Sequence, residues 1–302
     1  MTPDPGRDTR PLGTATWADP KTAAGKYGYR KGTIWLGRLN DGTAVGYGDD
    51  RHVCLVSGNR GGKGTSSIVP NLCLWPGSVV VVDPKGENAA VTAARRGSGS
   101  PHCTGMGQAV HVLDPFNAAP SVDKAYRSRF NPLDALDPND NQSVDEAARL
   151  ADAIVVVRED AKDPFWDDAA RKMLKGLILH VLTAEGYQGR RNLLTVRQLL
   201  MRGDWQAVEV YEAQRAPEIP SAHELLFKDM LLNPAFGGVV AGHGETLLGL
   251  MKRDAKLFEE VKASVDVHTE FLESPGLAEC LTESDFKLLD LKKAQNFSAR
   301  QN

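Results

Sequence analysis

A glycine-rich stretch with one lysine, residues 55–72, is the part of the sequence whose residue types fit chemistry most directly. It reads LVSGNRGGKGTSSIVPNL, so an apolar run stops, glycines follow and Lys63 stands among them. Glycines let a backbone approach a ligand closely and adopt positive φ, and the N-terminus of a following helix attracts anions. The stretch therefore indicates a phosphate-binding loop in which Lys63 bridges the β- and γ-phosphates of a nucleotide.

The match of this loop to the general pattern GxxxxGK[ST] is imperfect. Ser57 stands where the first glycine is expected. Gly64 stands where a hydroxyl usually reaches magnesium, and Thr65 follows one place later. A glycine-rich turn with a solvated lysine is the alternative interpretation. The position of the loop, after an apolar run and before a helix-like segment, favours phosphate binding.

Two carboxylates follow a second apolar run, SVVVVD at residues 78–83. Ligands of open α/β sheets bind beyond the carboxyl ends of strands, so Asp83 is a candidate to hold magnesium through water or to polarise an attacking water. A plain polar turn, with Glu87 favourably placed at a helix N-terminus, is the equally open alternative. The candidate catalytic residues are Lys63 and Glu87, and no residue is assigned as a direct metal ligand. The candidate cofactor-binding residues are Ser57, Gly58, Asn59, Arg60, Gly61, Gly62, Lys63, Gly64, Thr65 and Asp83.

The elements that must position these residues alternate between strand and helix. Apolar runs predict buried strands at 52–58, 78–83 and 109–114, with helical segments at 65–75 and 87–97 between them. Pro70 is expected to end or kink the first of these helices. This alternation predicts an α/β fold with a parallel sheet. Before it, residues 1–30 are expected to be extended, and Asp41-Gly42 predicts a hairpin turn.

The pattern changes near residue 140, after which the sequence is expected to be all-helical to about residue 285. Capping boxes, in which Ser or Thr precedes Glu or Gln by three residues, predict helix starts, as does a Pro after Asp. These signals are Ser143 with Glu146, Thr195 with Gln198, Ser221 with Glu224, and Asp163 with Pro164. A single further helix is expected to present Leu247, Leu250, Met251, Phe258 and Val261 on one face.

Other notable residues in this region have ordinary structural interpretations. Trp166 is expected to pack in the core, and Asp167 with Asp168 to form a solvated first helical turn. His180 and His243 have no partners at metal-ligand spacing and are expected to be structural.

The composition sets limits on the class of protein. The chain has 302 residues and a formal charge of −3, so no global basic signal for nucleic acid exists, although a local patch can bind it. Four cysteines without metal spacing predict reduced thiols in a cytoplasmic compartment. The sequence contains no apolar stretch of membrane-helix length and no signal peptide, so taken alone it predicts a soluble, intracellular chain.

The motifs together resemble the TraG-like coupling proteins of type IV secretion systems. The resemblance rests on the glycine-lysine loop, on IVPNLCLWPGS after it, and on VVVVDPKGEN. GTATWADP, HVLDPFN, FNPLDALDP, DPFWDDAARKMLKGLILHVL and FLESPGLAECLTESDF extend it to about residues 13–291. A glycine after the loop lysine is common in that family.

This resemblance implies a P-loop ATPase motor of the FtsK/HerA type, a RecA-like sheet with an inserted all-helical domain. It implies ATP and Mg²⁺ as cofactors, and a homo-hexamer in the full-length family. The implied partners are single-stranded DNA, relaxosome proteins and the secretion channel, and the implied location is the cytoplasmic face of the inner membrane. Four segments follow: an extended segment 1–30, the first part of the nucleotide-binding domain 31–140, an all-α domain 141–285 and a polar tail 286–302.

Two family features are not found in the sequence, which predicts a copy truncated at both ends. No membrane-spanning helix precedes TATWADP, and no apolar strand ending in Asp-Glu, the Walker B element, follows the helical region. AIVVVRED has acids after an apolar run but is expected on a capped helix. Weak nucleotide binding, poor hydrolysis and low stability are therefore expected. The alternative function is a non-catalytic module that only recognises substrates or relaxosome proteins. A different P-loop protein, such as a small-molecule kinase, is a weaker alternative.

Overall fold

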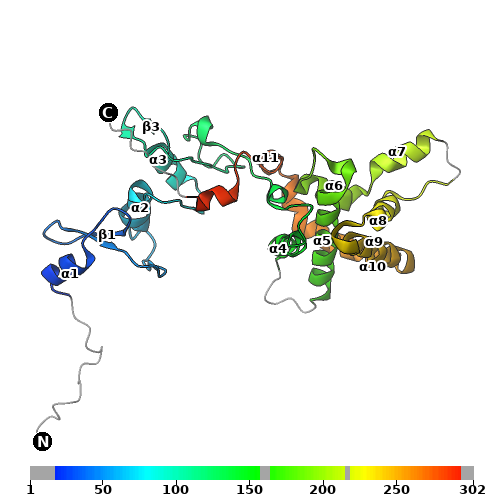
Figure 1. Ribbon diagram of the computed structural model, residues 1–302, viewed down its shortest axis with the longest axis horizontal. Coiled ribbons are helices and arrows are strands. Elements are labelled where there is room, and N and C mark those ends of the chain that lie inside the picture. The colour runs from blue at the N-terminus through cyan, green and yellow to red at the C-terminus, as the bar shows by residue number, and fades with distance from the viewer. Residues whose placement is uncertain (1–17, 157–163, 215–217, 294–302) are drawn as a thin grey trace, which may run out of the picture. The chain divides into compact units, whose positions relative to one another are not determined.

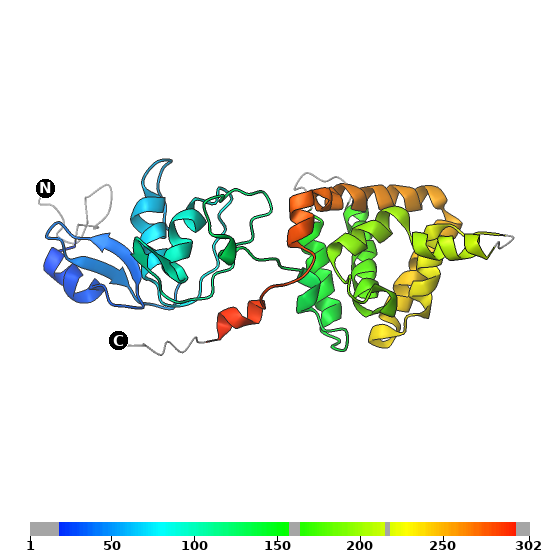
Figure 2. The same cartoon turned by 90° about the horizontal axis from the view of Figure 1, so that it is seen from above.

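The computed structural model describes residues 18–156, 164–214 and 218–293 (Figures 1 and 2). These residues form two units, each described by itself. The loop unit comprises residues 18–110, 119–126 and 293, and the helical unit comprises the described residues of 111–118 and 127–292. Asp163 and the residues 1–17 of the expected extended segment lie outside the described residues, as do 294–302 of the expected tail.

The loop unit combines short helices with two small antiparallel hairpins. Its elements are α1 (Pro20–Tyr27), β1 (Ile34–Arg38), β2 (Ala44–Tyr47), α2 (Val69–Leu74), α3 (Glu87–Arg96), β3 (Gly99–Ser100) and β4 (Cys103–Thr104). The β1–β2 hairpin forms around Asp41-Gly42 as expected, and Gly42 has a φ of +85° there. Helix α1 corrects the expectation of an extended chain up to residue 30. It forms because the Asp19 carboxylate accepts the Thr22 N–H at 2.9 Å and Pro20 starts the first turn.

The apolar runs expected as strands lie unpaired in the described loop unit. Residues 52–58 and 78–83 are in no strand, and Val56, Val80 and Val82 are 88%, 80% and 89% exposed. The third run reaches one bridge, a parallel one between Val112 and Arg127 within the helical unit. A parallel RecA-like sheet therefore stays a prediction for this chain.

The helical unit has α5 at its centre, in contact with α4, α6, α9 and α10 (Figure 1). Its helices are α4 (Ser143–Ile154), α5 (Phe165–Thr183), α6 (Leu193–Arg202), α7 (Trp205–Ala213), α8 (Ala222–Leu232), α9 (Ala235–Arg253), α10 (Ala255–Thr269) and α11 (Pro275–Cys280). Helix α5 buries ten residues because apolar side chains recur along several of its faces. The largest fully buried side chains include Phe227, Phe258, Met173, Leu174 and Ile178.

The predicted helix starts meet different outcomes. Ser221 caps α8, its hydroxyl accepting the Glu224 N–H at 3.2 Å, which confirms that prediction. The start predicted at Thr195 is wrong, because α6 begins earlier and the Asn192 amide oxygen accepts the Thr195 N–H at 3.0 Å. Ser143 begins α4 but does not cap it; its hydroxyl donates to the Asp137 carbonyl at 2.8 Å.

The single helix expected across residues 247–261 is in fact two helices. Asp254 leaves the helical conformation, with φ −147° and ψ 83°, between α9 and α10. Its carboxylate accepts the Leu257 N–H at 2.9 Å and so caps α10. The apolar pattern continued through the break because both helices face the same core.

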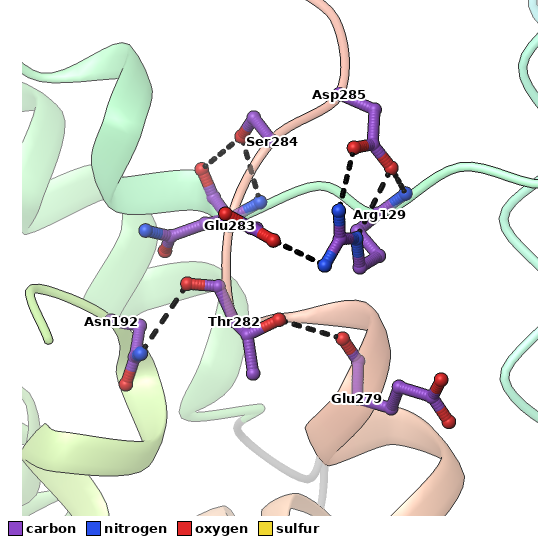
Figure 3. A network of polar contacts seen from close by, with 8 residues as sticks. Arg129, Asn192, Glu279, Thr282, Glu283, Ser284 and Asp285 are labelled. Atoms are coloured by element: carbon purple, nitrogen blue, oxygen red, sulfur yellow. Dashed lines mark hydrogen bonds and ion pairs between the residues drawn. The ribbon is translucent and has the colours of Figure 1, made fainter. Parts of the chain in front are cut away.

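The segments that lead into and out of the helices of this unit are tied to each other (Figure 3). The Phe130 N–H donates to the Cys280 carbonyl at 2.8 Å, and the Asp285 N–H donates to the Arg129 carbonyl at 3.1 Å. The Arg129 guanidinium pairs with both Glu283 and Asp285. These contacts join residues far apart in the sequence. Arg129 and Asp285, for example, are 156 positions apart.

Candidate functional site

The glycine-lysine loop makes a tight backbone turn in which two glycines are required. The Gly61 N–H donates to the Gly58 carbonyl at 3.2 Å, and a Cβ on Gly61 would lie 2.0 Å from the Ser57 hydroxyl oxygen. Gly62 has a φ of +78°, and Arg60, a residue with a side chain, has a φ of +60°. Left-handed residues at two positions out of three are a feature that anion-binding loops share.

The side chains of the loop hydrogen-bond to its own carbonyls. The Lys63 ammonium donates to the Ser57 carbonyl at 2.7 Å and to the Gly58 carbonyl at 3.0 Å. The Thr65 and Ser66 hydroxyls both donate to the Gly62 carbonyl, at 3.2 and 2.7 Å. Lys63 therefore bonds back across the turn, and a bound phosphate would offer it charged oxygen acceptors in place of these neutral carbonyls.

A widened helical turn follows the loop at Gly64–Ile68, where the Val69 N–H donates to the Gly64 carbonyl. Such an i→i+5 turn is π-helical, and such turns recur at functional sites. The regular helix α2 starts immediately after it with Pro70 in its first turn, a position where the missing N–H costs little. The loop is thus followed directly by a helix, and Pro70 lies where the π-helical turn changes into the regular helix α2.

The two candidate carboxylates lie at the start of α3. The Asp83 carboxylate accepts the Ala89 N–H at 2.9 Å and the Asn88 side-chain amide at 3.2 Å. Gly86, with φ +68°, completes the turn, and Glu87 is the first residue of the helix. The Asp83 carboxylate thus bonds to the first turn of α3, and Glu87 stands at the N-terminus of that helix, where the dipole favours it. Among the described residues, no hydrogen bond or ion pair joins Lys63 to Asp83 or Glu87.

A contact that sequence reasoning missed joins the loop helix to the first hairpin. The Asn71 side chain on α2 accepts the Trp35 N–H at 2.7 Å and donates to the Trp35 carbonyl at 2.9 Å. The same amide also donates to the Ser67 carbonyl at 2.8 Å. Asn71 therefore pairs with β1 as a neighbouring strand would. Only its place in the IVPNL motif marks it in the sequence.

Two adjacent pairs of arginines in the sequence, Arg95-Arg96 and Arg190-Arg191, are engaged in hydrogen bonds within the structure. Arg96 is 7% exposed and donates to the carbonyls of Leu72, Trp75 and Gly77 at 2.7–3.2 Å, and burial lowers its pKa. Arg95 donates to the Cys73 and Thr104 carbonyls at 3.2 and 2.5 Å. Arg190 donates to Gln206 at 2.7 Å, and Arg191 reaches the Ala184 carbonyl at 3.5 Å. These arginines hold backbone turns, so a surface for nucleic acid must be sought elsewhere.

The histidines and acids of the helical unit have structural surroundings. His180 is fully buried on α5, with its Nε2 3.3 Å from Asp229, and His243 packs against Gly176. Trp166 packs against the core as expected. The expectation that Asp167 is solvated is wrong. Its carboxylate lies 3.3 Å from His268 Nε2, and its side chain is 16% exposed. No group of three or more metal-ligating side chains occurs among the described residues.

A P-loop-like turn that opens a helix, in a chain that also carries an all-helical unit, is the combination expected of a type IV secretion coupling protein. The chain belongs to this class: the model of the family described as type IV secretory system conjugative DNA transfer matches residues 12–296.

Named relatives agree with the family assignment. The conjugal transfer protein TraG of Escherichia coli is 27% identical over 190 residues, which are 56% of this chain and 28% of the relative. The type IV secretion system-coupling protein VirD4 of Bartonella quintana is 27% identical over 198 residues, 62% of this chain and 29% of the relative. The protein VirD4 of Rhizobium radiobacter is 29% identical over 182 residues, 57% and 25% of the two chains. The matched part is thus under a third of each of these relatives.

The loop residues fit a phosphate better than the described acids fit a magnesium ion. Gly61 and Gly62 leave room for the backbone turn, and Lys63 brings a cation to its side. Asp83, the carboxylate proposed for magnesium, is committed to α3. In the part of the chain that the structure describes, no helix is long and apolar enough to cross a membrane.

Proposed function

We propose that this chain contributes to a coupling protein that binds ATP at residues 57–65 and helps to deliver DNA, or protein, to a type IV secretion channel. The observation that carries the proposal is the Ser57–Thr65 turn, with Lys63 beside it and a helix directly after it. Backbone N–H groups of the turn and the N-terminus of the helix would bind the phosphates, and Lys63 would neutralise them. The family match supplies the setting in DNA transfer.

The finer parts of the proposal rest on the family alone. They are Mg²⁺ as the second cofactor, Glu87 in a catalytic role, a RecA-like sheet around the loop and a homo-hexameric ring. Single-stranded DNA, relaxosome proteins and channel proteins are the proposed partners, at the cytoplasmic face of the inner membrane. The names of the VirD4 and TraG relatives support this setting.

A second candidate function is a non-catalytic recognition module built on the helical unit. Two observations favour it over turnover. The helical unit has a complete apolar core, and the loop side chains are hydrogen-bonded to their own backbone. In this case the loop binds nucleotide without cleaving it, or does not bind it.

The test is nucleotide binding and ATP turnover by the chain and its Lys63→Ala variant, with and without single-stranded DNA. Lys85→Ala, which removes an exposed lysine from the turn before α3, is the matched control. We expect wild type and Lys85→Ala to bind a fluorescent ATP analogue equally, and Lys63→Ala to bind at least tenfold more weakly, the loss of about 1.4 kcal/mol.

The three outcomes separate the two functions. Turnover that Lys63→Ala abolishes supports a motor. Binding without turnover supports the recognition module. Binding that is equal in all three proteins rules out Lys63 as a phosphate ligand, and binding that is absent in all three rules out the motor.

A further inference from the structure

The first hairpin of the loop unit and the helix before it carry a concentration of positive charge that the nucleotide loop does not use. Residues 20–38 contain no Asp or Glu, although the whole chain is acidic at −3. All five of their basic side chains are exposed. These are Lys21, Lys26, Arg30, Lys31 and Arg38.

Three of the acids that flank this stretch hydrogen-bond to local groups, and among the described residues no ion pair joins any of the three to the five cations. Asp19 caps α1 through the Thr22 N–H. Asp41, in the hairpin turn, accepts the Thr43 N–H at 2.9 Å, and Asp49 pairs with Arg51.

Aromatic rings are set between these cations. Tyr29 and Trp35 meet edge to face, with ring centroids 5.4 Å apart and planes at 76°. The Arg38 guanidinium carbon lies 5.5 Å from the centre of the Trp35 ring, and the Lys26 ammonium lies 5.2 Å from that of Tyr27. Tyr27 is 37% exposed. We call these three rings and the five cations the aromatic-basic surface.

The fold holds this surface in place. Trp35 faces Gly46 across the hairpin, and a Cβ on Gly46 would lie 2.9 Å from the Tyr29 ring, so a glycine is needed beneath that ring. Both backbone hydrogen-bonding groups of Trp35 are taken by Asn71, on the helix that the glycine-lysine loop opens. Trp35 is therefore bonded directly to that helix.

We propose that the aromatic-basic surface binds single-stranded nucleic acid, with the cations on phosphates and the rings on bases. Of these rings Tyr27 is exposed, and Tyr29 and Trp35 are half-buried. Alternation of cations with aromatic rings is the arrangement used for strands bound without sequence preference. This inference rests on the proposed role in DNA delivery and names the surface that contacts the strand.

An anionic membrane is the competing ligand for such a surface, and the observations disfavour it. Interfacial helices bury a broad aliphatic face in lipid. Helix α1 reads PKTAAGKY and has no large aliphatic side chain. Between residues 20 and 38, the exposed large apolar side chains of the described structure are Tyr27 and Leu36.

The test measures binding of a short fluorescein-labelled oligothymidine by anisotropy over a range of salt concentrations. Arg30→Gln/Lys31→Gln removes two exposed cations from the aromatic-basic surface. Arg202→Gln/Lys256→Gln removes an exposed pair from the helical unit and is the matched control. Each single-strand phosphate contact contributes about 0.7 to the slope of log affinity against log salt. We expect the first variant to lower that slope by about 1.4 and to weaken binding roughly tenfold near 0.1 M salt, and the control to change neither.

Two more measurements examine the rings and the membrane. Trp35→Phe keeps an aromatic ring in the packed position, and we expect it to remove most of the tryptophan quenching that oligothymidine causes in wild type. Co-sedimentation with vesicles of phosphatidylcholine and phosphatidylserine is expected to leave the wild-type chain in the supernatant.

Three results would overturn the proposal: no binding of oligothymidine by wild type, equal losses in the two double variants, or binding to vesicles that needs Arg30 and Lys31. ATP binding at Lys63 is measured separately. The nucleotide proposal can therefore fail while strand binding persists, and strand binding can fail while the nucleotide proposal stands.

Discussion

The two units differ in how many apolar side chains they bury. The helical unit buries a continuous cluster of large apolar side chains, among them Phe227, Leu226 and Met230, each fully buried. In the described loop unit, the buried apolar residues are Leu72, Ala93, Ala119 and Val122, while every position from 48 to 61 is exposed, including the apolar run 53–56. The helical unit thus has a large apolar core, and the described part of the loop unit buries few apolar side chains.

The reason for this difference lies in backbone hydrogen bonding. A helix pairs its own N–H and C=O groups, so a group of helices needs only apolar faces that match. A strand pairs its backbone with a neighbour, so VCLVS and VVVVD cannot become strands without one. Local sequence is therefore enough for the helical unit, whereas residues 52–58 and 78–83 have no strand partner among the described residues.

The largest expected effect that tests this contrast is truncation of a core side chain in each unit. Phe227→Ala removes a fully buried ring from α8 and should lower the free energy of unfolding by about 3–5 kcal/mol. Val82→Ala, at a side chain 89% exposed, should change it by less than about 0.5 kcal/mol. Urea unfolding followed by circular dichroism measures both. A loss of more than about 1 kcal/mol in Val82→Ala would mean that the apolar run is buried in solution.

A smaller effect is expected at Asn71, whose side chain hydrogen-bonds to the backbone of Trp35 as a paired strand would. Asn71→Ala leaves the Trp35 N–H and carbonyl without these partners, and should destabilise the first hairpin by about 1–3 kcal/mol. Amide hydrogen exchange in residues 34–47 measures the change locally. Asn71→Asp keeps the acceptor for the Trp35 N–H and should fall between wild type and Asn71→Ala. Equal exchange in all three proteins would mean that Asn71 does not contribute to the stability of the hairpin.

Sequence reasoning succeeded where the signal was local. The Asp41-Gly42 turn and the Ser221 cap each follow from residues close to one another in the sequence. It failed where a nearby competitor decided the outcome, as when Asn192 capped α6 in place of Thr195 and when Asp254 interrupted an apolar pattern that runs on through two helices.

Long-range contacts were beyond the sequence. Nothing in the residues around Arg96 indicates its partners, yet it donates to carbonyls 19 to 24 positions away. For the candidate site, the sequence located the loop and the two carboxylates. It could not show that Lys63 bonds to its own loop or that Asp83 bonds to the first turn of α3, because both depend on backbone conformation rather than residue type.

The smallest effect, a dependence of stability on pH, is expected in the helical unit. Burial lowers the pKa of His223 on α8 and of His243 on α9 below the usual 6.5, although the Leu200 carbonyl 2.9 Å from His223 Nε2 opposes the shift. Below about pH 6.5 the unfolded chain therefore binds protons that the folded unit does not, and stability falls as the pH falls. Lys262 and Glu259 face His223 with opposite effects, and Lys175 adds to the shift at His243.

The measurement is urea unfolding at pH 7.5 and pH 5.5 for wild type and for His223→Gln/His243→Gln. Wild type should lose stability at the lower pH, and the double variant, less stable at pH 7.5 through lost packing, should lose less between the two values. Because carboxylates such as Asp229 also have a lowered pKa, part of the acid loss should remain in the variant at still lower pH. An identical change in both proteins would mean that the pH dependence of the helical unit comes from groups other than these two histidines.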